Sequence, residues 1–291
     1  MLTLASRTAL IRSIERARNV TLIAYVLPRG AVFEALAAAA RRGARVRVRL
    51  DGRPYYDAAG GMHRRNEATV KSLRGDGVDA KLADEDGAHE LHVKAAIVDA
   101  KVYLDDVNFG AEGTIVRDTS ARDAAALRAA LAGRRVRESQ HFSARKDGAL
   151  GIEAALLRRA RCGAIVETEA AGRGNGVWNA LARLGREGLR PRLLVARRTL
   201  GEKERTSLER LARDGVCVRV CSSNEKFAVC GDGVWAGSAN ATSAYETPNQ
   251  IDWGVGTRST HIAARLRARF DARWQRAAPL IAQRAMRRSG S

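Results

Sequence analysis

The sequence is poor in aromatic residues and contains no long apolar run. Aromatic residues make up 5% of its 291 positions, which leaves little material for platforms on which nucleic-acid bases stack. No segment approaches the roughly 18–20 apolar residues needed to span a bilayer. Residues 1–19 are predicted to form an amphipathic helix that Arg and Glu interrupt, unlike a secretion signal. We therefore expect a soluble, cytoplasmic protein.

Cysteines are also few, and their spacing is not that of a metal site. The four are Cys162, Cys217, Cys221 and Cys230. None forms a Cys-x2-Cys pair, and no group of His and Cys has the spacing of zinc ligands. We interpret them as buried, reduced thiols of a cytosolic protein, and we predict neither a metal nor another cofactor.

Acidic residues are outnumbered, because 51 Lys and Arg stand against 32 Asp and Glu, for a net charge of +19. The excess is spread along the chain, and the one dense basic block is residues 261–288. One interpretation is a solvated basic surface. The other is a surface that collects a phosphodiester polymer or an anionic membrane. Since aromatic residues are few, a nucleic-acid partner would be contacted along its backbone more than at its bases.

The chain contains an internal repeat. Residues 17–50 resemble residues 160–195, and residues 70–82 resemble residues 205–220. Each half is predicted to contain helix, strand, helix, strand, helix, strand and then a further strand that carries polar side chains. Glycines stand where the helices should end, at Gly43, Gly77, Gly188 and Gly215. A duplicated α/β unit explains this pattern best.

The repeat divides the chain into two predicted domains, residues 1–142 and residues 143–291. The division falls in a polar stretch, residues 137–151, which follows an Ala-rich helix. A chain of this length is expected to form about two domains.

One short segment of the first half concentrates polar residues around an apolar run. Residues 95–98 are small or β-branched and are predicted to form a buried strand. His92 and Lys94 precede this strand, Asp99 follows it, and Asn108 comes nine positions later. Residues two apart on a strand point to the same face, so an imidazole should lie beside a fixed cation.

The second half repeats this spacing with different residues. Asn224 and Lys226 precede its apolar run, and Asn240 lies as far from Asn224 as Asn108 lies from His92. A lone His is more often structural than catalytic. The repeated spacing is therefore the stronger reason to assign a function to these residues.

These motifs resemble the signature of the phospholipase D superfamily, in which His-x-Lys-x4-Asp followed by Gly-Ser-x-Asn is present once per half. The first half has His92, Lys94 and Asp99, but Asp105 and Asp106 stand where Gly-Ser is usual. The second half keeps Lys226 and the run Gly237-Ser238-Ala239-Asn240. It has Asn224 in place of the His and Gly231 in place of the Asp, with Asp232 one position late.

The resemblance covers roughly residues 5–280, and residues 270–279 look like the last helix of the family. It implies an α/β fold of two fused α-β-α sandwich repeats related by a pseudo-twofold axis, with mixed β-sheets flanked by helices. It also implies a metal-independent reaction in which His92 attacks phosphorus and forms a phosphohistidine. Four side chains would hold the phosphate oxygens, namely Lys94, Asn108, Lys226 and Asn240.

Four further residues receive roles near this site. Asp118 is predicted to accept a hydrogen bond from His92 and fix its tautomer. Asp252 is its counterpart in the half where no His remains to orient; either Asp is equally well interpreted as an exposed or capping residue. Asp99 is predicted to be structural, holding the turn after the strand, and Ser238 is expected near the site.

Asn224 is the departure that most affects activity. An amide can form hydrogen bonds but cannot exchange protons at neutral pH. Three interpretations follow. A substitute acid such as His89 or Glu90 takes part, a homodimer brings two copies of His92 together, or the chain is a slow enzyme or a pseudoenzyme that binds polyanions.

The sequence thus predicts a hydrolase that cleaves phosphodiester bonds, and it favours a nuclease that contacts the DNA or RNA backbone. The alternatives are a phospholipase D or phosphatidyltransferase resembling cardiolipin synthases, acting on anionic phospholipid, and a catalytically impaired nucleic-acid-binding protein. A monomer with two fused repeats is the expected form.

Overall fold

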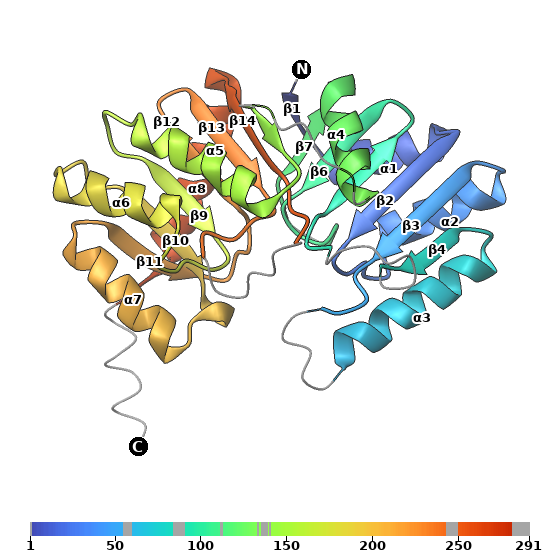
Figure 1. The fold of residues 1–291 in the computed structure, drawn as a ribbon, viewed down its shortest axis with the longest axis horizontal. Helices are drawn as coiled ribbons and strands as arrows, with labels where there is room; N and C mark the ends of the chain where they lie inside the picture. The colour runs from blue at the N-terminus through green and yellow to red at the C-terminus, as the bar shows by residue number, and fades with distance from the viewer. Residues whose placement is uncertain are drawn as a thin grey trace. The chain divides into compact units, whose positions relative to one another are not determined.

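The computed structural model in Figure 1 describes residues 2–54, 60–83, 91–110, 113–132, 134, 139, 141–242 and 250–280. The chain forms two compact units. The first comprises Met1–Gly148 and Tyr245–Trp253, and the second comprises Ala149–Ala244 and Gly254–Ser291. Among the described residues, no helix has the length and apolar character needed to cross a membrane.

The first unit is built on a mixed sheet. Its strands are β1 (Leu2–Ala5), β2 (Asn19–Ala24), β3 (Arg45–Leu50), β4 (Asp79–Leu82), β5 (Ala95–Val98), β6 (Lys101–Asp105) and β7 (Ile115–Asp118). Its helices are α1 (Arg7–Arg16), α2 (Ala31–Arg41), α3 (Gly61–Gly75) and α4 (Ala121–Leu131). The sheet runs β1-β7-β6-β5-β2-β3-β4. Strands β2, β3 and β4 are parallel, and the other pairings are antiparallel.

The second unit repeats this plan. Its strands are β9 (Ile165–Thr168), β10 (Arg192–Ala196), β11 (Cys217–Cys221), β12 (Phe227–Cys230), β13 (Gly233–Gly237), β14 (Gly254–Arg258) and β15 (Ala278–Pro279). Its helices are α5 (Lys146–Arg158), α6 (Gly176–Arg186), α7 (Glu202–Arg213) and α8 (Thr260–Arg276), with a 3-10 turn η2 (Arg197–Thr199). The sheet runs β15-β11-β10-β9-β12-β13-β14-β8, in which β8 is Phe142–Ser143. Helix α8 packs against β11, β12 and β13.

Strand register shows how closely the two units correspond. Ala95 of β5 lies opposite Ile23 of β2, and Phe227 of β12 lies opposite Glu167 of β9. The hairpins β5–β6 and β12–β13 also share one register. The predicted α/β fold, with two mixed sheets flanked by helices, is confirmed (Figure 1). The four glycines predicted at helix ends all have left-handed backbone angles, with φ between 77° and 95°, which side chains with a Cβ adopt at a cost.

Each unit has an apolar core of its own against its sheet. Strand β3 alternates exposed or half-buried arginines with buried Val46, Val48 and Leu50, as expected for a strand with one covered face. In contrast, β5 is buried at every position. Because β5 and β12 each lie in the interior of their sheet, the polar residues that precede them are held by rigid structure.

Three predictions about local structure are corrected. Residues 2–5 form β1, which pairs with β7, instead of starting a helix. Helix α1 begins after Ser6, whose side chain accepts a hydrogen bond from Ala9 N (3.1 Å). The last helix ends at Arg276, and β15 follows. The four cysteines are free but not buried, because Cys162 is exposed in the turn after α5 and the others are partly exposed at strand ends.

Helix α5 begins at Lys146, inside the stretch predicted as a linker. Residues 250–253 belong to the first unit although they follow most of the second in sequence. This return of the chain matters for the site, because it carries Asp252.

Candidate active site

His92 is held by a carboxylate within the first unit. Its Nδ1 lies 2.9 Å from Asp252 Oδ1. Asp252 is fully buried, and its second oxygen accepts a hydrogen bond from Gln250 Nε2 (2.6 Å). Since a carboxylate accepts, Nδ1 carries the proton, and the lone pair of the imidazole is then on Nε2. This hydrogen bond fixes the orientation of the ring.

The predicted partners of His92 are therefore corrected. Asp118 does not contact the imidazole; it ends β7, and its Oδ1 accepts from Ser120 N (2.8 Å). Burial raises the pKa of Asp118 to about 6. Asp252, predicted to have no His to orient, is the residue that binds His92. The reason is topological, because the segment bearing Asp252 belongs to the first unit, and Ile251 forms a bridge with Leu91 beside His92.

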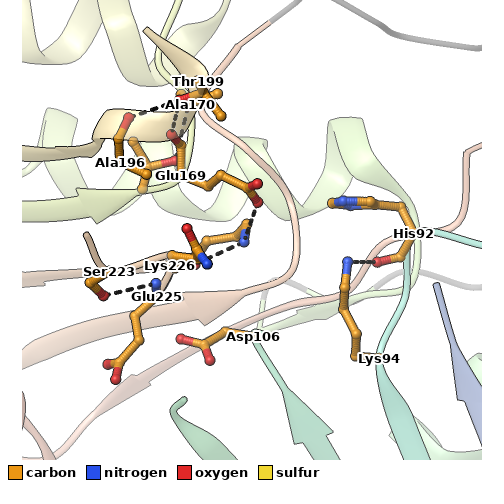
Figure 2. A network of polar contacts seen from close by, with 12 residues as sticks. His92, Lys94, Asp106, Glu169, Ala170, Ala196, Thr199, Ser223, Glu225 and Lys226 are labelled. Carbon is orange, nitrogen blue, oxygen red and sulfur yellow. Dashed lines mark hydrogen bonds and ion pairs between the residues drawn. The ribbon is translucent and has the colours of Figure 1, made fainter. Parts of the chain in front are cut away.

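Lys94 and His92 both interact with the ring of Tyr25, which follows β2. The His92 and Tyr25 rings meet edge to face, with centroids 5.3 Å apart. Lys94 Nζ lies 5.4 Å from the centroid of the Tyr25 ring and donates to the carbonyl of His92 (Figure 2). The lysine is almost completely buried. The predicted neighbourhood of an imidazole and a fixed cation is thus present in the first unit.

The backbone ahead of His92 is fixed by a residue that the sequence analysis did not identify. Asp51 directly follows β3 and is buried. Its Oδ2 accepts a hydrogen bond from Leu91 N (2.7 Å), and its Oδ1 accepts one from Arg53 N (2.6 Å). Asp51 therefore ties the motif segment to the end of a neighbouring strand.

Asn108 and the two acidic residues before it shape the loop after β6. Asn108 Oδ1 accepts from Val26 N (3.2 Å). Asp105 Oδ2 accepts from Phe109 N (2.5 Å), and Asp106 Oδ1 accepts from Thr114 N (2.7 Å). Burial raises the pKa of Asp105 to about 7. Asp105 and Asp106 thus accept hydrogen bonds from the loop backbone, at the positions where the phospholipase D signature has Gly-Ser.

Asp99 lies in the turn at the other end of β5. Its Oδ1 accepts from Arg18 N (3.2 Å) and Asn19 N (2.9 Å), where β2 begins. Its φ of 52° is left-handed, and Gly231, at the same place in the second unit, has a φ of 57°. These contacts agree with a structural role for Asp99. In the second unit a glycine adopts the same angle, and Asp232 pairs on the surface with Arg258 (3.1 Å).

In the second unit Lys226 is paired with a carboxylate. Its Nζ lies 3.0 Å from Glu169 Oε2 (Figure 2). It also donates to the backbone carbonyl of Asn224 (2.9 Å). Glu169 also pairs with Arg198 of η2. Lys226 is nearly fully buried, with 2% of its side chain exposed. The lysine is therefore charge-balanced by an acid that sequence reasoning missed.

The amides of this unit have a different character. Asn224 and Asn240 each have a buried Oδ1 without a hydrogen-bond partner among the described residues. Ser238 is buried.

Behind the motif, Arg273 of α8 binds both Glu167 (2.9 Å) and Glu225. Burial raises the pKa of Glu167 to about 7 in spite of this pairing. The cluster fastens α8 to the motif segment.

Two of the predicted site residues cannot be placed. His89 and Glu90, considered as substitute acids, lie outside the described residues. Among the residues that the structure does describe, no group of three or more His, Cys, Asp or Glu side chains has the arrangement of a metal site.

Tyr25, Glu169, Asp51 and Gln250 are the site residues that the sequence analysis missed. Aligning the two repeats on their strands would have placed Tyr25 and Glu169 at one position, two residues beyond Ile23 and Glu167. The sequence gives no comparable signal for Gln250, since its role depends on the return of the chain to the first unit.

Comparison with known proteins supports the resemblance. Residues 10–113 match a family model described as cardiolipin synthase, phospholipase D-like domain. No curated protein matches the chain.

Three solved structures are similar to this one. Phosphatidylserine synthase from Haemophilus influenzae Rd KW20 has a TM-score of 0.62 at 11% identity, over 94% of this chain and 85% of that one. Polyphosphate kinase from Porphyromonas gingivalis has a TM-score of 0.59 at 15% identity, over 90% of this chain. The match spans only 48% of the kinase. Nuc from Salmonella typhimurium, a phospholipase D family member, has a TM-score of 0.41 at 18% identity, over 48% of this chain and 94% of that one. Residues 10–113 thus resemble a phospholipase D-like domain, and the chain shares its fold with phosphatidylserine synthase over most of both chains.

Proposed function

We propose that the protein is a metal-independent enzyme of phosphodiester chemistry in which His92 is the nucleophile. The observation that carries this proposal is the hydrogen bond from His92 Nδ1 to the buried, Gln250-bound carboxylate of Asp252. A buried carboxylate stabilises the imidazolium that forms as Nε2 is consumed. Lys94 adds a buried positive charge two residues away.

The first half-reaction follows from this geometry. The lone pair of His92 Nε2 attacks phosphorus, a P–N bond forms, and the bond from phosphorus to the leaving oxygen breaks with its electron pair. The leaving alkoxide takes a proton from solvent or a side chain, because Asn224 cannot supply one. In the second half-reaction water or an alcohol attacks the phosphohistidine. The P–N bond breaks, His92 is regenerated, and the incoming hydroxyl loses its proton.

Nucleic acid is the substrate class that we propose first. The net charge of +19 favours a polymer that carries one phosphate per nucleotide. Contacts of Lys and Arg with phosphates supply affinity without reading sequence, which suits a chain with few aromatic residues.

Phospholipid is the second candidate, and a specific observation favours it. The matching family model is described as a cardiolipin synthase domain, and the similar structure covering most of both chains is a phosphatidylserine synthase. In this case an alcohol would replace water in the second half-reaction, and the product would be a new phosphodiester.

One assay separates the two candidates. The protein and its His92→Ala variant are incubated in EDTA with single-stranded DNA, RNA, phospholipid vesicles containing an acceptor alcohol, and a nitrophenyl phosphodiester. We expect cleavage of nucleic acid and of the nitrophenyl ester by wild type only. Product from vesicles alone would establish the phospholipid function, and equal activity of His92→Ala would remove His92 as nucleophile.

A further inference from the structure

The second unit contains a cavity that none of the motif residues lines. Its volume is about 500 Å³, and its walls are Arg173, Trp178, Arg210, Arg213 and Asp214. Arg173 precedes α6, and Trp178 lies in the first turn of that helix. Arg210 and Arg213 lie in the last turn of α7, which Asp214 caps. Three guanidinium groups from two segments thus surround one recess.

The single carboxylate in this cavity is already paired. Asp214 Oδ2 lies 3.3 Å from Arg186, the last residue of α6. In the described part of the chain, Arg210 and Arg213 form no ion pair. Cations near the end of a helix are favoured by its dipole, which gives these two arginines a local reason to be present. The helix dipole does not explain why Arg173, from the segment before α6, lines the same cavity.

The first unit provides an internal reference for what the fold requires. There, Arg41 ends α2 and pairs with Asp76, which caps α3. This pair corresponds to Arg186 and Asp214, the pair that joins α6 to α7. The ion pair between the two helix ends is therefore part of the shared scaffold.

The additional arginines are not part of that scaffold. Counted back from the capping aspartates, Arg210 and Arg213 correspond to Ser72 and Gly75. The first unit therefore forms the same pair of helices without either guanidinium. Because like charges repel each other, placing three arginines around one cavity costs free energy. The fold does not require this arrangement, and a bound anion would offset its cost.

We propose that this cavity is a phosphate-binding exosite that holds the backbone of a nucleic-acid strand. The proposal rests on the nucleic-acid function above and names a second contact for the same substrate. Guanidinium groups match the geometry of phosphate oxygens and stay charged at all relevant pH values. A strand can enter a recess, whereas the surface of a bilayer is flat. Trp178, with 8% of its surface exposed, offers no apolar anchor for a membrane.

The first test measures binding of fluorescent single-stranded DNA by anisotropy at several salt concentrations, in the His92→Ala background so that no cleavage occurs. The double variant Arg210→Gln/Arg213→Gln should lower affinity on the order of tenfold at 0.1 M salt and reduce the log–log salt slope by about 1.4, since each single-strand phosphate contact contributes roughly 0.7. The matched control is Arg159→Gln/Arg161→Gln. These exposed arginines of the same unit lie outside the cavity, and the control should lose less than threefold.

The second test locates the ligand. Trp178 lines the cavity, so DNA should quench part of the protein fluorescence, and Trp178→Phe should abolish that part while retaining affinity. Phenylalanine is tolerated at this position in the first unit, where Phe33 is the third residue of α2.

Three outcomes would overturn the exosite. They are equal losses in the two double variants, unchanged quenching in Trp178→Phe, and a larger loss of binding to anionic vesicles than to DNA. Cleavage is scored separately with wild type. If DNA binds with the exosite signature but is not cleaved, the proposed function fails and the exosite stands. If DNA is cleaved and the double variants behave alike, the exosite fails and the function stands.

Discussion

Lys94 and Lys226 occupy the same register beside equivalent strands but have different neighbours. Lys94 precedes Ala95, opposite Ile23, and Lys226 precedes Phe227, opposite Glu167. Two residues beyond Ile23 stands Tyr25, whose ring faces Lys94 at 5.4 Å. Two residues beyond Glu167 stands Glu169, whose carboxylate pairs with Lys226 at 3.0 Å.

This difference separates the chemistry of the two motifs. The ring of Tyr25 attracts Lys94 through its aromatic face, whereas Glu169 pairs with Lys226 through a full negative charge. The first motif keeps an imidazole beside a buried cation. The second has an amide and a charge-balanced lysine, secured by Arg198 and by the Arg273 cluster. We infer that the shared fold supports a reactive motif in the first unit and a structural or binding motif in the second.

The largest predicted effect contrasts His92 with Asn224. His92→Ala should reduce hydrolysis of a nitrophenyl phosphodiester in EDTA to background, because His92 forms the P–N bond in the proposed reaction. Asn224→Ala should stay within about tenfold of wild type, since one hydrogen bond contributes roughly 1 kcal/mol. His141→Ala, at an exposed position, is the control for loss of an imidazole. Equal losses at His92 and Asn224 would contradict the assignment of chemistry to the first motif.

The second prediction contrasts Asp252 with Asp118. Asp252→Asn removes the acceptor that orients the imidazole, and the activity should fall by about 10²–10⁴, as for an aspartate-to-asparagine change in another histidine-based site. Asp118→Asn keeps an acceptor for Ser120 N and should change the rate less than threefold. The pH–rate profile is the second readout. Only Asp252→Asn should shift the part of the profile that reports the titration of His92. A larger effect at Asp118 would reverse the assignment made from the structure.

The corrected roles of Asp118 and Asp252 show which contacts can be predicted from the sequence and which cannot. The predicted strands, the helix-terminal glycines and the duplicated α/β fold all follow from local patterns: apolar runs, turn residues and a repeat. The side-by-side position of His92 and Lys94 follows from the geometry of a strand. Each of these depends only on residues close together in the chain.

The partner of His92 depends on a contact across 160 positions. The repeat suggests that Asp118 serves the first motif because it follows that motif directly. The chain instead returns to the first unit after β13, and no local pattern encodes this return. Glu169 is a similar case, since the pairing of a carboxylate with Lys226 requires knowing that β9 and β12 are neighbours.

The third prediction restores a titratable ring to the second motif. Asn224→His places an imidazole in the segment that contains Lys226 and should raise the steady rate of nitrophenyl ester turnover by about ten- to a hundredfold, below the upper range for general acid–base help. The pre-steady-state burst should change less, because a nitrophenolate leaves without protonation. Quenched samples analysed by intact mass should show less phosphohistidine than wild type. A burst that rises as much as the steady rate would place the limiting step before the adduct.

The fourth prediction concerns stability and compares helix α1, which precedes β2, with helix α5, which precedes β9. In α1, Leu10 lies seven residues before Ala17, and in α5, Glu153 lies seven residues before Ala160. Both side chains are buried, and both oxygens of Glu153 lack a hydrogen-bond partner among the described residues. Burial raises the pKa of Glu153 to about 8 from the 4.5 of a free glutamate. The acid form is therefore favoured in the folded state.

The sign of the pH dependence follows from this shift. The folded state binds the proton more tightly than the unfolded state, so stability is greatest below pH 4.5 and is lost as the pH rises toward 8. Denaturant unfolding from pH 5 to 9 should show wild type losing a few kcal/mol relative to Glu153→Gln, which cannot ionise. Glu153→Leu, the residue found at position 10, should be the most stable of the three at pH 8. A difference between wild type and Glu153→Gln that stays constant with pH would mean that Glu153 does not titrate in this range.

The last prediction compares the two lysines and includes the smallest expected change, at Glu169. Lys94→Ala should lower turnover by on the order of a hundredfold, because a preorganised cation near the reacting phosphate is removed. Lys226→Ala should lower it only a fewfold, since Glu169 balances that charge in wild type. Glu169→Gln keeps the size of the side chain but leaves Lys226 its full charge, and it should strengthen inhibition by inorganic phosphate or sulfate about two- to fivefold. In Glu169→Gln, a further Lys226→Ala change should then cost more than it does in wild type, a coupling that a double-mutant cycle measures directly. If Lys226→Ala and Lys94→Ala lower the turnover of wild type equally, the ion pair with Glu169 does not reduce the contribution of Lys226. Both motifs would then contribute charge to one reaction.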